Sequence, residues 1–156
     1  MPRIAIVLAA AAVASLALSA APTAARPHER TITIKARSQL DQVQAVDNAP
    51  AGASAGDMLI FTERLFDLSG KRIGSDAATC VRLFDQTSLC TGVYRLPRGR
   101  VMVHLLQPGP TGTYRQAVTG GTGRFAGARG TVTVAQKPGG DRFTFRLRLE
   151  RRRNKA

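Results

Sequence analysis

Apolar and polar side chains alternate in short runs along most of the chain, and the clearest run lies near its end. Between residues 142 and 150 every second residue is large and apolar: Phe143, Phe145, Leu147 and Leu149. Alternation with a period of two is the pattern of a strand with one buried and one exposed face. The segment therefore predicts a β-strand with its apolar face in a core and its arginines in solvent.

Similar runs recur along the chain, separated by turn sequences. Ile32, Ile34 and Ala36 share one face of a predicted strand at 31–37. Later runs rich in β-branched and aromatic residues are bounded by Gly, Pro, Asp and Ser. They lie near 58–66, 74–83, 88–96, 99–107, 113–119 and 130–136. Eight short strands joined by tight turns predict an all-β fold, either a sandwich or an eight-stranded antiparallel barrel of lipocalin-like architecture.

The segment between the first two predicted strands shows no regular alternation. Residues 47–56 consist mostly of Ala, Gly, Ser, Asp and Pro, which favours a loop. Leu40, Val43 and Val46 have the spacing of one helical turn, but the stretch is too short to predict a helix. We expect residues 26–55 to form the first strand and a flexible linker, and residues 56–150 to form the barrel body.

The N-terminus has the pattern of a secretory signal peptide over residues 1–25. Arg3 precedes an apolar run from Ile4 to Leu18, which is followed by small residues. The apolar run is shorter than a membrane-spanning helix needs. We expect cleavage after Ala20, Ala24 or Ala25, and a secreted protein.

Cys80 and Cys90 are the only cysteines. An even pair in an oxidising compartment favours one disulfide. Facing residues in a hairpin have a constant index sum, and centring this hairpin on Asp85 places the two cysteines directly opposite each other. With only His28 and His104 as imidazoles, and no CxxC or HxxxH spacing, metal ligands are too few. We expect neither a metal nor a cofactor.

The chain is strongly basic, with 23 Lys and Arg against 10 Asp and Glu and a formal net charge of +13. Seven cations near the end form a predicted basic face and a tail at 151–156: Arg142, Arg146, Arg148, Arg151, Arg152, Arg153 and Lys155. Such a surface attracts anionic lipid headgroups, teichoic-type polymers or nucleic acid. Without a nucleic-acid motif or stacking aromatics, specific nucleic-acid binding is not expected. A solvated surface is the simpler interpretation.

Two longer segments contain recognisable motifs. Residues 56–83 read GDMLIFTERLFDLSGKRIGSDAATCVRL, with a GD before a strand ending in FT-x-x-L, a KRIG turn and an AxxCV strand. Residues 117–130 read AVTGGTGRFAGARG, close to ITGG[ST]GxFxGAxG. The glycines of 119–130 lack the GxxxxGK spacing of a nucleotide-binding loop and favour turns. In these segments, and in the closing Phe143-Thr144-Phe145, the chain resembles the allene oxide cyclase barrel family and its dirigent relatives.

The resemblance implies an eight-stranded antiparallel barrel with a mostly apolar interior. In the plant members it implies trimers that cyclise an unstable allene oxide or steer radical coupling. The cyclases carry an E-x-N-E cluster on the first strand, whereas residues 31–38 read TITIKARS here. Because no acid or amide lies there, allene oxide cyclase activity is not expected.

The family's barrel-lining cysteine stands at Cys80, which implies that the face with Cys90, Gly92 and Tyr94 points inward. Register carried through a Pro97–Gly99 turn and a Pro108–Gly112 loop extends this face. The further predicted pocket residues are Met102, His104, Leu106, Tyr114, Gln116 and Val118. Of the pocket residues, Tyr94, Met102, Tyr114 and Gln116 are our candidate ligand-binding residues.

Glu63 occupies the position of a barrel-lining Asn of the family. A four-residue loop at Ser69–Arg72 turns Glu63 inward, whereas a three-residue loop turns Arg64 inward beside Asp76; we favour the first. Inside the barrel, Glu63 would have His104 or Tyr94 as partner, and burial would raise the pKa of its carboxyl toward the range of a general acid. Glu63 and His104 are the candidate catalytic residues, although a solvent-facing Glu63 is the simpler interpretation.

The same register leaves Val101, Val103 and Leu105 as an exposed apolar stripe, which a homotrimer would cover. Two functions follow from these observations. The first is a secreted barrel that binds an apolar ring-containing or polyene molecule and steers its cyclisation or coupling. The alternative is a non-catalytic exported barrel that binds anionic envelope or matrix polymers through its basic face.

Overall fold

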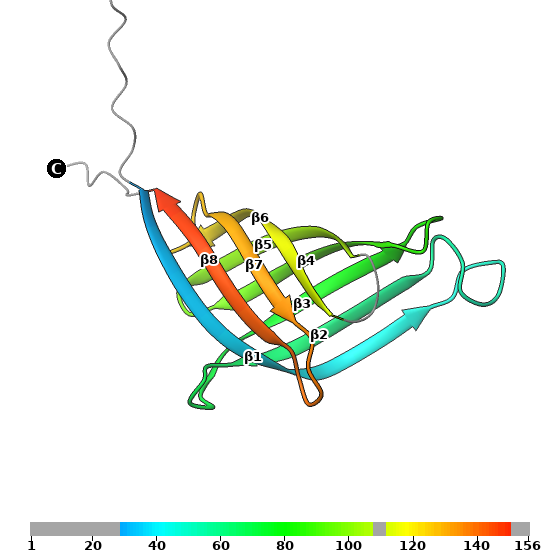
Figure 1. Cartoon of the computed structure of the whole chain (residues 1–156), viewed down its shortest axis with the longest axis horizontal. Coiled ribbons are helices and arrows are strands. Elements are labelled where there is room, and N and C mark those ends of the chain that lie inside the picture. The colour runs from blue at the N-terminus through cyan, green and yellow to red at the C-terminus, as the bar shows by residue number, and fades with distance from the viewer. Residues whose placement is uncertain (1–28, 108–111, 151–156) are drawn as a thin grey trace, which may run out of the picture.

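The computed structural model describes residues 29–107 and 112–150, which form one closed antiparallel barrel (Figure 1). Each strand pairs with its neighbours in the chain, and β1 pairs with β8 to close the barrel. The eight strands are β1 (Glu29–Val46), β2 (Met58–Phe66), β3 (Arg72–Arg82), β4 (Ser88–Leu96), β5 (Gly99–Gln107), β6 (Thr113–Gly123), β7 (Arg129–Ala135) and β8 (Arg142–Glu150). The predicted eight-stranded antiparallel barrel is confirmed.

Strand β1 is longer than predicted, and part of the expected flexible linker belongs to it. It pairs with β8 through Arg37 and with β2 from Arg37 to Val46. A register shift between Leu40 and Gln42 leaves Asp41 as an extra residue, a β-bulge. At the bulge, the distance along the chain between successive inward-facing residues rises from two to three, from Leu40 to Val43. This explains why the sequence here has the spacing of a helical turn although it forms a strand. The connection to β2 is therefore 47–57.

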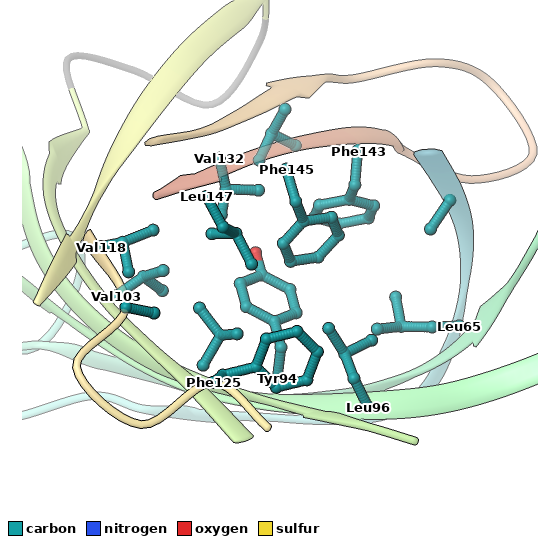
Figure 2. Close-up of a cluster of buried hydrophobic side chains, with 14 of the residues drawn as sticks. Leu65, Tyr94, Leu96, Val103, Val118, Phe125, Val132, Phe143, Phe145 and Leu147 are labelled. Atoms are coloured by element: carbon teal, nitrogen blue, oxygen red, sulfur yellow. The ribbon is translucent and has the colours of Figure 1, made fainter. Parts of the chain in front are cut away.

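A hydrophobic core fills the end of the barrel that carries the β4–β5 and β6–β7 turns, and we call this the closed end. Figure 2 shows these side chains converging from all sides of the barrel. Phe125, in the β6–β7 turn, is 2% exposed and packs with Leu96, Val101 and Leu147. Gly99 permits this packing, because a Cβ there would lie 2.9 Å from the Phe125 ring and 2.2 Å from the Thr122 carbonyl oxygen.

The β4–β5 turn corrects the predicted face of β5. Leu96 pairs with Gly99, so the turn has two residues, Pro97 and Arg98, and not three. Arg98 adopts a left-handed backbone conformation with φ of 74°, which completes the turn without Gly99. A one-residue change in register exchanges the two faces of a strand. Val101 and its alternate neighbours therefore face the interior.

The predicted exposed stripe is consequently wrong. Val101, Val103 and Leu105 are buried, with 0%, 4% and 9% of their surfaces exposed. Leu106, predicted to line the pocket, lies on the outer face and is 56% exposed.

The predicted signal peptide at 1–25 and the basic tail at 151–156 lie outside the described residues. In the part of the chain that the structure describes, no helix is long and apolar enough to cross a membrane.

Candidate functional site

The opposite end of the barrel contains a cavity of about 920 Å³. We call it the open end; the connections at 47–57, 83–87 and 136–141 contribute residues to its lining. The wall is largely apolar, with Leu59, Phe61, Val103, Leu105 and Phe143 among the lining residues. An apolar concave wall with a few polar groups is typical of a small-molecule site.

A pair of carboxylic acids forms the polar part of this cavity. Glu63 on β2 pairs directly with Asp76 on β3, and both line the cavity. The Ser38 hydroxyl on β1 donates a hydrogen bond of 3.0 Å to Glu63 Oε1. The same hydroxyl accepts a hydrogen bond from the Asp141 N–H at 3.1 Å. Three strands and the β7–β8 connection thus hold Glu63 in place.

Burial sets the protonation of this pair. It raises the pKa of the Asp76 carboxyl to about 8, and the nearby charge of Glu63 adds to the rise. Burial also raises the pKa of Glu63, while the Ser38 hydrogen bond opposes that rise. Within the pair, Asp76 lowers the pKa of Glu63 and Glu63 raises the pKa of Asp76, so the proton favours Asp76. The pair therefore retains one proton at neutral pH and titrates as a unit.

Asp76 also has unused hydrogen-bonding capacity. Asp76 is only 4% exposed, and its Oδ1 atom has no hydrogen-bond partner. Buried polar atoms are nearly always hydrogen-bonded in folded proteins, so this atom is available to a bound molecule.

Tyr94 and Gln116 form a second polar contact next to the acids. The Tyr94 hydroxyl donates a buried hydrogen bond of 2.6 Å to Gln116 Oε1. Its ring stands edge-on to Phe143 and Phe145, with centroid distances of 5.7 and 4.8 Å (Figure 2). Burial raises the pKa of the Tyr94 phenol well above its ordinary value, so it stays a neutral donor. The half-buried Tyr114 lines the cavity beside Gln116.

The structure brings together four of the six candidate residues. Glu63, Tyr94, Tyr114 and Gln116 line the cavity, as their predicted inward orientation requires. Their catalytic or ligand-binding roles remain predictions.

The structure excludes the other two candidates from the cavity. His104 and Met102 lie on the outer face of β5, opposite Thr91 and Val93 of β4. The cause is the two-residue Pro97–Arg98 turn, which reverses the face of β5. The predicted contact of Glu63 with His104 is therefore wrong, and Asp76 occupies the position opposite Glu63.

Sequence reasoning did not select Asp76 or Asp141 as site residues, and it missed Ser38, which holds Glu63 by a hydrogen bond. Asp76 could have been found, because it lies four residues before Cys80 and so shares its face on a strand. Ser38 and Asp141 gave no such signal, since Ser38 was assigned to a linker and Asp141 to a turn.

The disulfide between Cys80 and Cys90 is present, with an S–S distance of 2.02 Å. The cysteines face each other on β3 and β4, as the hairpin register predicted. Both line the cavity wall. The bond hints at a location outside the cytoplasm. Among the described residues, no group of three or more His, Cys, Asp or Glu side chains is arranged to hold a metal ion.

Fold and site together define a small closed β-barrel with an acid-containing cavity at one end. The family model for the allene oxide cyclase barrel-like domain matches residues 33–147. The chain therefore belongs to the allene oxide cyclase barrel-like family. No curated protein matches the chain significantly.

Solved structures support the same fold. Pyocyanin demethylase is 28% identical, with a TM-score of 0.68 over 74% of this chain and 99% of that protein. A pterocarpan synthase dirigent protein is 13% identical, with a TM-score of 0.65 over 85% of this chain and 99% of the other. An exo-specific intermolecular Diels–Alderase is 12% identical, with a TM-score of 0.60 over 78% and 99%.

Proposed function

We propose that the protein binds a small ring-containing or polyene molecule in the open end of the barrel and steers its cyclisation or coupling. The observation that carries this proposal is the pair of buried Asp76 and half-buried Glu63 in a largely apolar cavity of about 920 Å³. The similar proteins support it, because their names describe a demethylase of pyocyanin, a pterocarpan synthase and a Diels–Alderase.

Catalysis here would rest on confinement and on one shared proton. The apolar wall holds a flexible substrate in one reactive conformer and excludes water. The acid pair donates a hydrogen bond or its proton to a carbonyl or ring heteroatom as charge develops. These acids lie on β2 and β3 and not on the first strand, so we do not propose the allene oxide cyclase reaction.

A matched pair of variants tests binding in the cavity. Ala78→Phe places a phenyl ring in the cavity, whereas Ala117→Phe places the same ring on the outer face of β6. We expect Ala78→Phe to weaken binding of an apolar fluorescent probe, 9-methylanthracene, at least tenfold, and Ala117→Phe to leave it unchanged. Equal affinity for both variants would place the probe outside the barrel.

Steering is tested with a polyene that cyclises measurably without protein. Wild-type protein should change the rate or the product ratio, and Ala78→Phe should not. A product ratio identical to that of the uncatalysed reaction for every substrate in a broad set would reduce the proposal to binding alone.

We also propose secretion, with the N-terminal segment removed by cleavage after Ala20, Ala24 or Ala25. The Cys80–Cys90 disulfide supports an oxidising compartment. Mass analysis of protein recovered from the medium should find a chain that begins at residue 21, 25 or 26. A chain retaining Met1 would contradict cleavage.

One observation favours the alternative function. The outer face of β1, β7 and β8 presents six exposed cations, which we call the basic face: Lys35, Arg37, Arg129, Arg142, Arg146 and Arg148. Two pairs stand directly opposite each other, Arg37 with Arg142 and Arg129 with Arg148. Like charges in this position repel, and an anionic polymer would relieve the repulsion.

A second pair of variants tests this alternative. Arg37→Gln/Arg142→Gln removes one facing pair, and Arg95→Gln/Arg100→Gln removes a facing pair on β4 and β5. If the basic face binds a poly(glycerol phosphate) polymer, only the first variant weakens binding. Equal losses would indicate general attraction by net charge.

A further inference from the structure

Acidic residues are concentrated in the cavity of this basic protein. The sequence has 10 Asp and Glu, and five of them line the cavity: Asp47, Asp57, Glu63, Asp76 and Asp141. Of 23 Lys and Arg, only Arg82 is among the lining residues that the structure describes. The cavity therefore has the opposite charge balance to the rest of the molecule.

The acids are layered by depth. Asp47 and Asp57 lie in or beside the β1–β2 connection at the mouth, where the Arg82 guanidinium donates a hydrogen bond of 3.0 Å to Gln86 Oε1. Glu63 and Asp76 lie deeper, on β2 and β3, and the half-buried Asp141 lines the same cavity. No cationic side chain lines this deeper part within residues 29–107 and 112–150. These deeper acids therefore have no cationic partner among the described residues that line the cavity.

Two further observations point to a ligand. Asp76 is more than nine-tenths buried, lines the cavity and leaves Oδ1 without a partner. Aromatic rings of Phe61, Tyr94 and Phe143 line the same space. Ring faces attract cations, and buried carboxylates are costly unless they are paired with one.

From this arrangement we infer that the cavity selects organic monocations with an apolar ring body, such as N-alkylated heteroaromatic ions or protonated ring amines. The cationic nitrogen lies against Glu63 and the free Oδ1 of Asp76, and the rings lie against the aromatic wall. This inference rests on the proposed function, since it names the class of molecule that the same cavity takes. Long-range attraction cannot produce the selectivity, because the protein's net charge of +13 repels cations.

Three probes of similar three-ring shape separate charge from shape: 10-methylacridinium, neutral 9-methylanthracene and anionic anthracene-9-carboxylate. Each is titrated into the protein at pH 7.5 and followed by fluorescence and calorimetry. We expect the cation to bind at least tenfold more tightly than the neutral probe, and the anion most weakly. Glu63→Gln/Asp76→Asn should reduce the preference for the cation to about twofold or less, and Glu150→Gln, an exposed acid at the far end of β8, should preserve it.

The outcomes distinguish the two proposals. If Ala78→Phe blocks both probes but the neutral one binds wild type as tightly as the cation, the cavity function stands and the inference fails. If no probe binds in the cavity, the proposed function fails as well.

Proton release from wild-type protein provides a second test that needs no folded double variant. The titratable groups that face the Glu63–Asp76 pair come from β4, β6 and the β7–β8 connection: Tyr94, Tyr114 and Asp141. A bound cation favours the doubly ionised pair, so binding should release up to one proton per chain. Calorimetry in two buffers of different ionisation enthalpy measures this release. Binding of the cation without proton release between pH 6.5 and 7.5 would contradict its placement against the pair.

Discussion

Glu63 and Asp76 face each other across the β2–β3 hairpin, and both line the cavity inside the barrel. The arrangement makes the unliganded barrel less stable at high pH. Because burial raises the pKa of Asp76 from 3.8 to about 8, the folded state binds more protons than the unfolded state between these values. The free energy of unfolding should therefore fall as pH rises from about 4 to about 8.

Asp76→Asn should remove most of this pH dependence. At pH 8 the variant should be more stable than wild type, by an amount on the order of 3 kcal/mol, and at pH 4 the two should be similar. Urea denaturation across this range measures the difference, with Glu150→Gln as a charge-matched control on the surface. Parallel pH profiles for wild type and Asp76→Asn would show that Asp76 ionises normally.

Adjacent residues on β5 test which face is buried. Val103→Asp introduces an unpaired charge at a position 4% exposed and should lower stability by about 3–5 kcal/mol or prevent folding. His104→Asp makes a similar change on the outer face and should alter stability by less than about 0.5 kcal/mol. It should also leave probe binding intact. If His104→Asp were strongly destabilising and Val103→Asp were tolerated, the result would support the three-residue turn, with His104 facing the interior.

The disulfide should stabilise the β3–β4 hairpin. Its cysteines are separated by 10 residues, and closing so short a loop contributes about 2–3 kcal/mol in the chain-entropy model. Cys80→Ala/Cys90→Ala should lose that amount in denaturant titrations. Intact masses before and after reduction should differ by two hydrogens per chain. Two free thiols in protein recovered from the medium would contradict an exported disulfide.

Self-association is a separate prediction. Four exposed apolar side chains on the outer faces of β2, β4 and β5 form what we call the outer apolar patch: Ile60, Leu89, Met102 and Leu106. We expect this patch, and not the stripe predicted from sequence, to lie in the contacts of a homotrimer. Light scattering should then give three times the chain mass for wild type and one chain mass for Met102→Glu/Leu106→Glu. A wild-type monomer at all concentrations would leave the patch without this role.

Register errors propagate around a barrel from one strand to the next. The prediction of a three-residue β4–β5 turn exchanged the inward and outward faces of β5. It counted Gly99 as a turn residue, whereas Arg98 has the left-handed conformation and Gly99 already pairs with Leu96. A second one-residue error at the β5–β6 connection restored the correct face of β6, where Val103 pairs with Val118. Tyr114 and Gln116 were thus placed correctly by two errors that cancel.

Register shifts within hairpins made the remaining cross-strand partners unpredictable from the sequence. In the β2–β3 hairpin, five residues connect Phe66 to Arg72, and a register shift follows Leu65. The index sum therefore changes within the hairpin, and neither predicted loop length gives the observed pairing of Glu63 with Asp76. Strand existence depends on local alternation and was predictable, whereas cross-strand partners depend on single inserted residues that composition does not reveal.

The separation of the packed closed end from the hollow open end has a consequence for how this barrel can change. The turn around Phe125 and the core beneath it fix the strand pairing at one end, so replacing Leu59, Phe61 or Leu105 at the other end alters the cavity without disturbing the scaffold. Binding specificity can then diverge among relatives, or be redesigned, at little expense in foldability. The open end is the place to begin directed evolution of this protein.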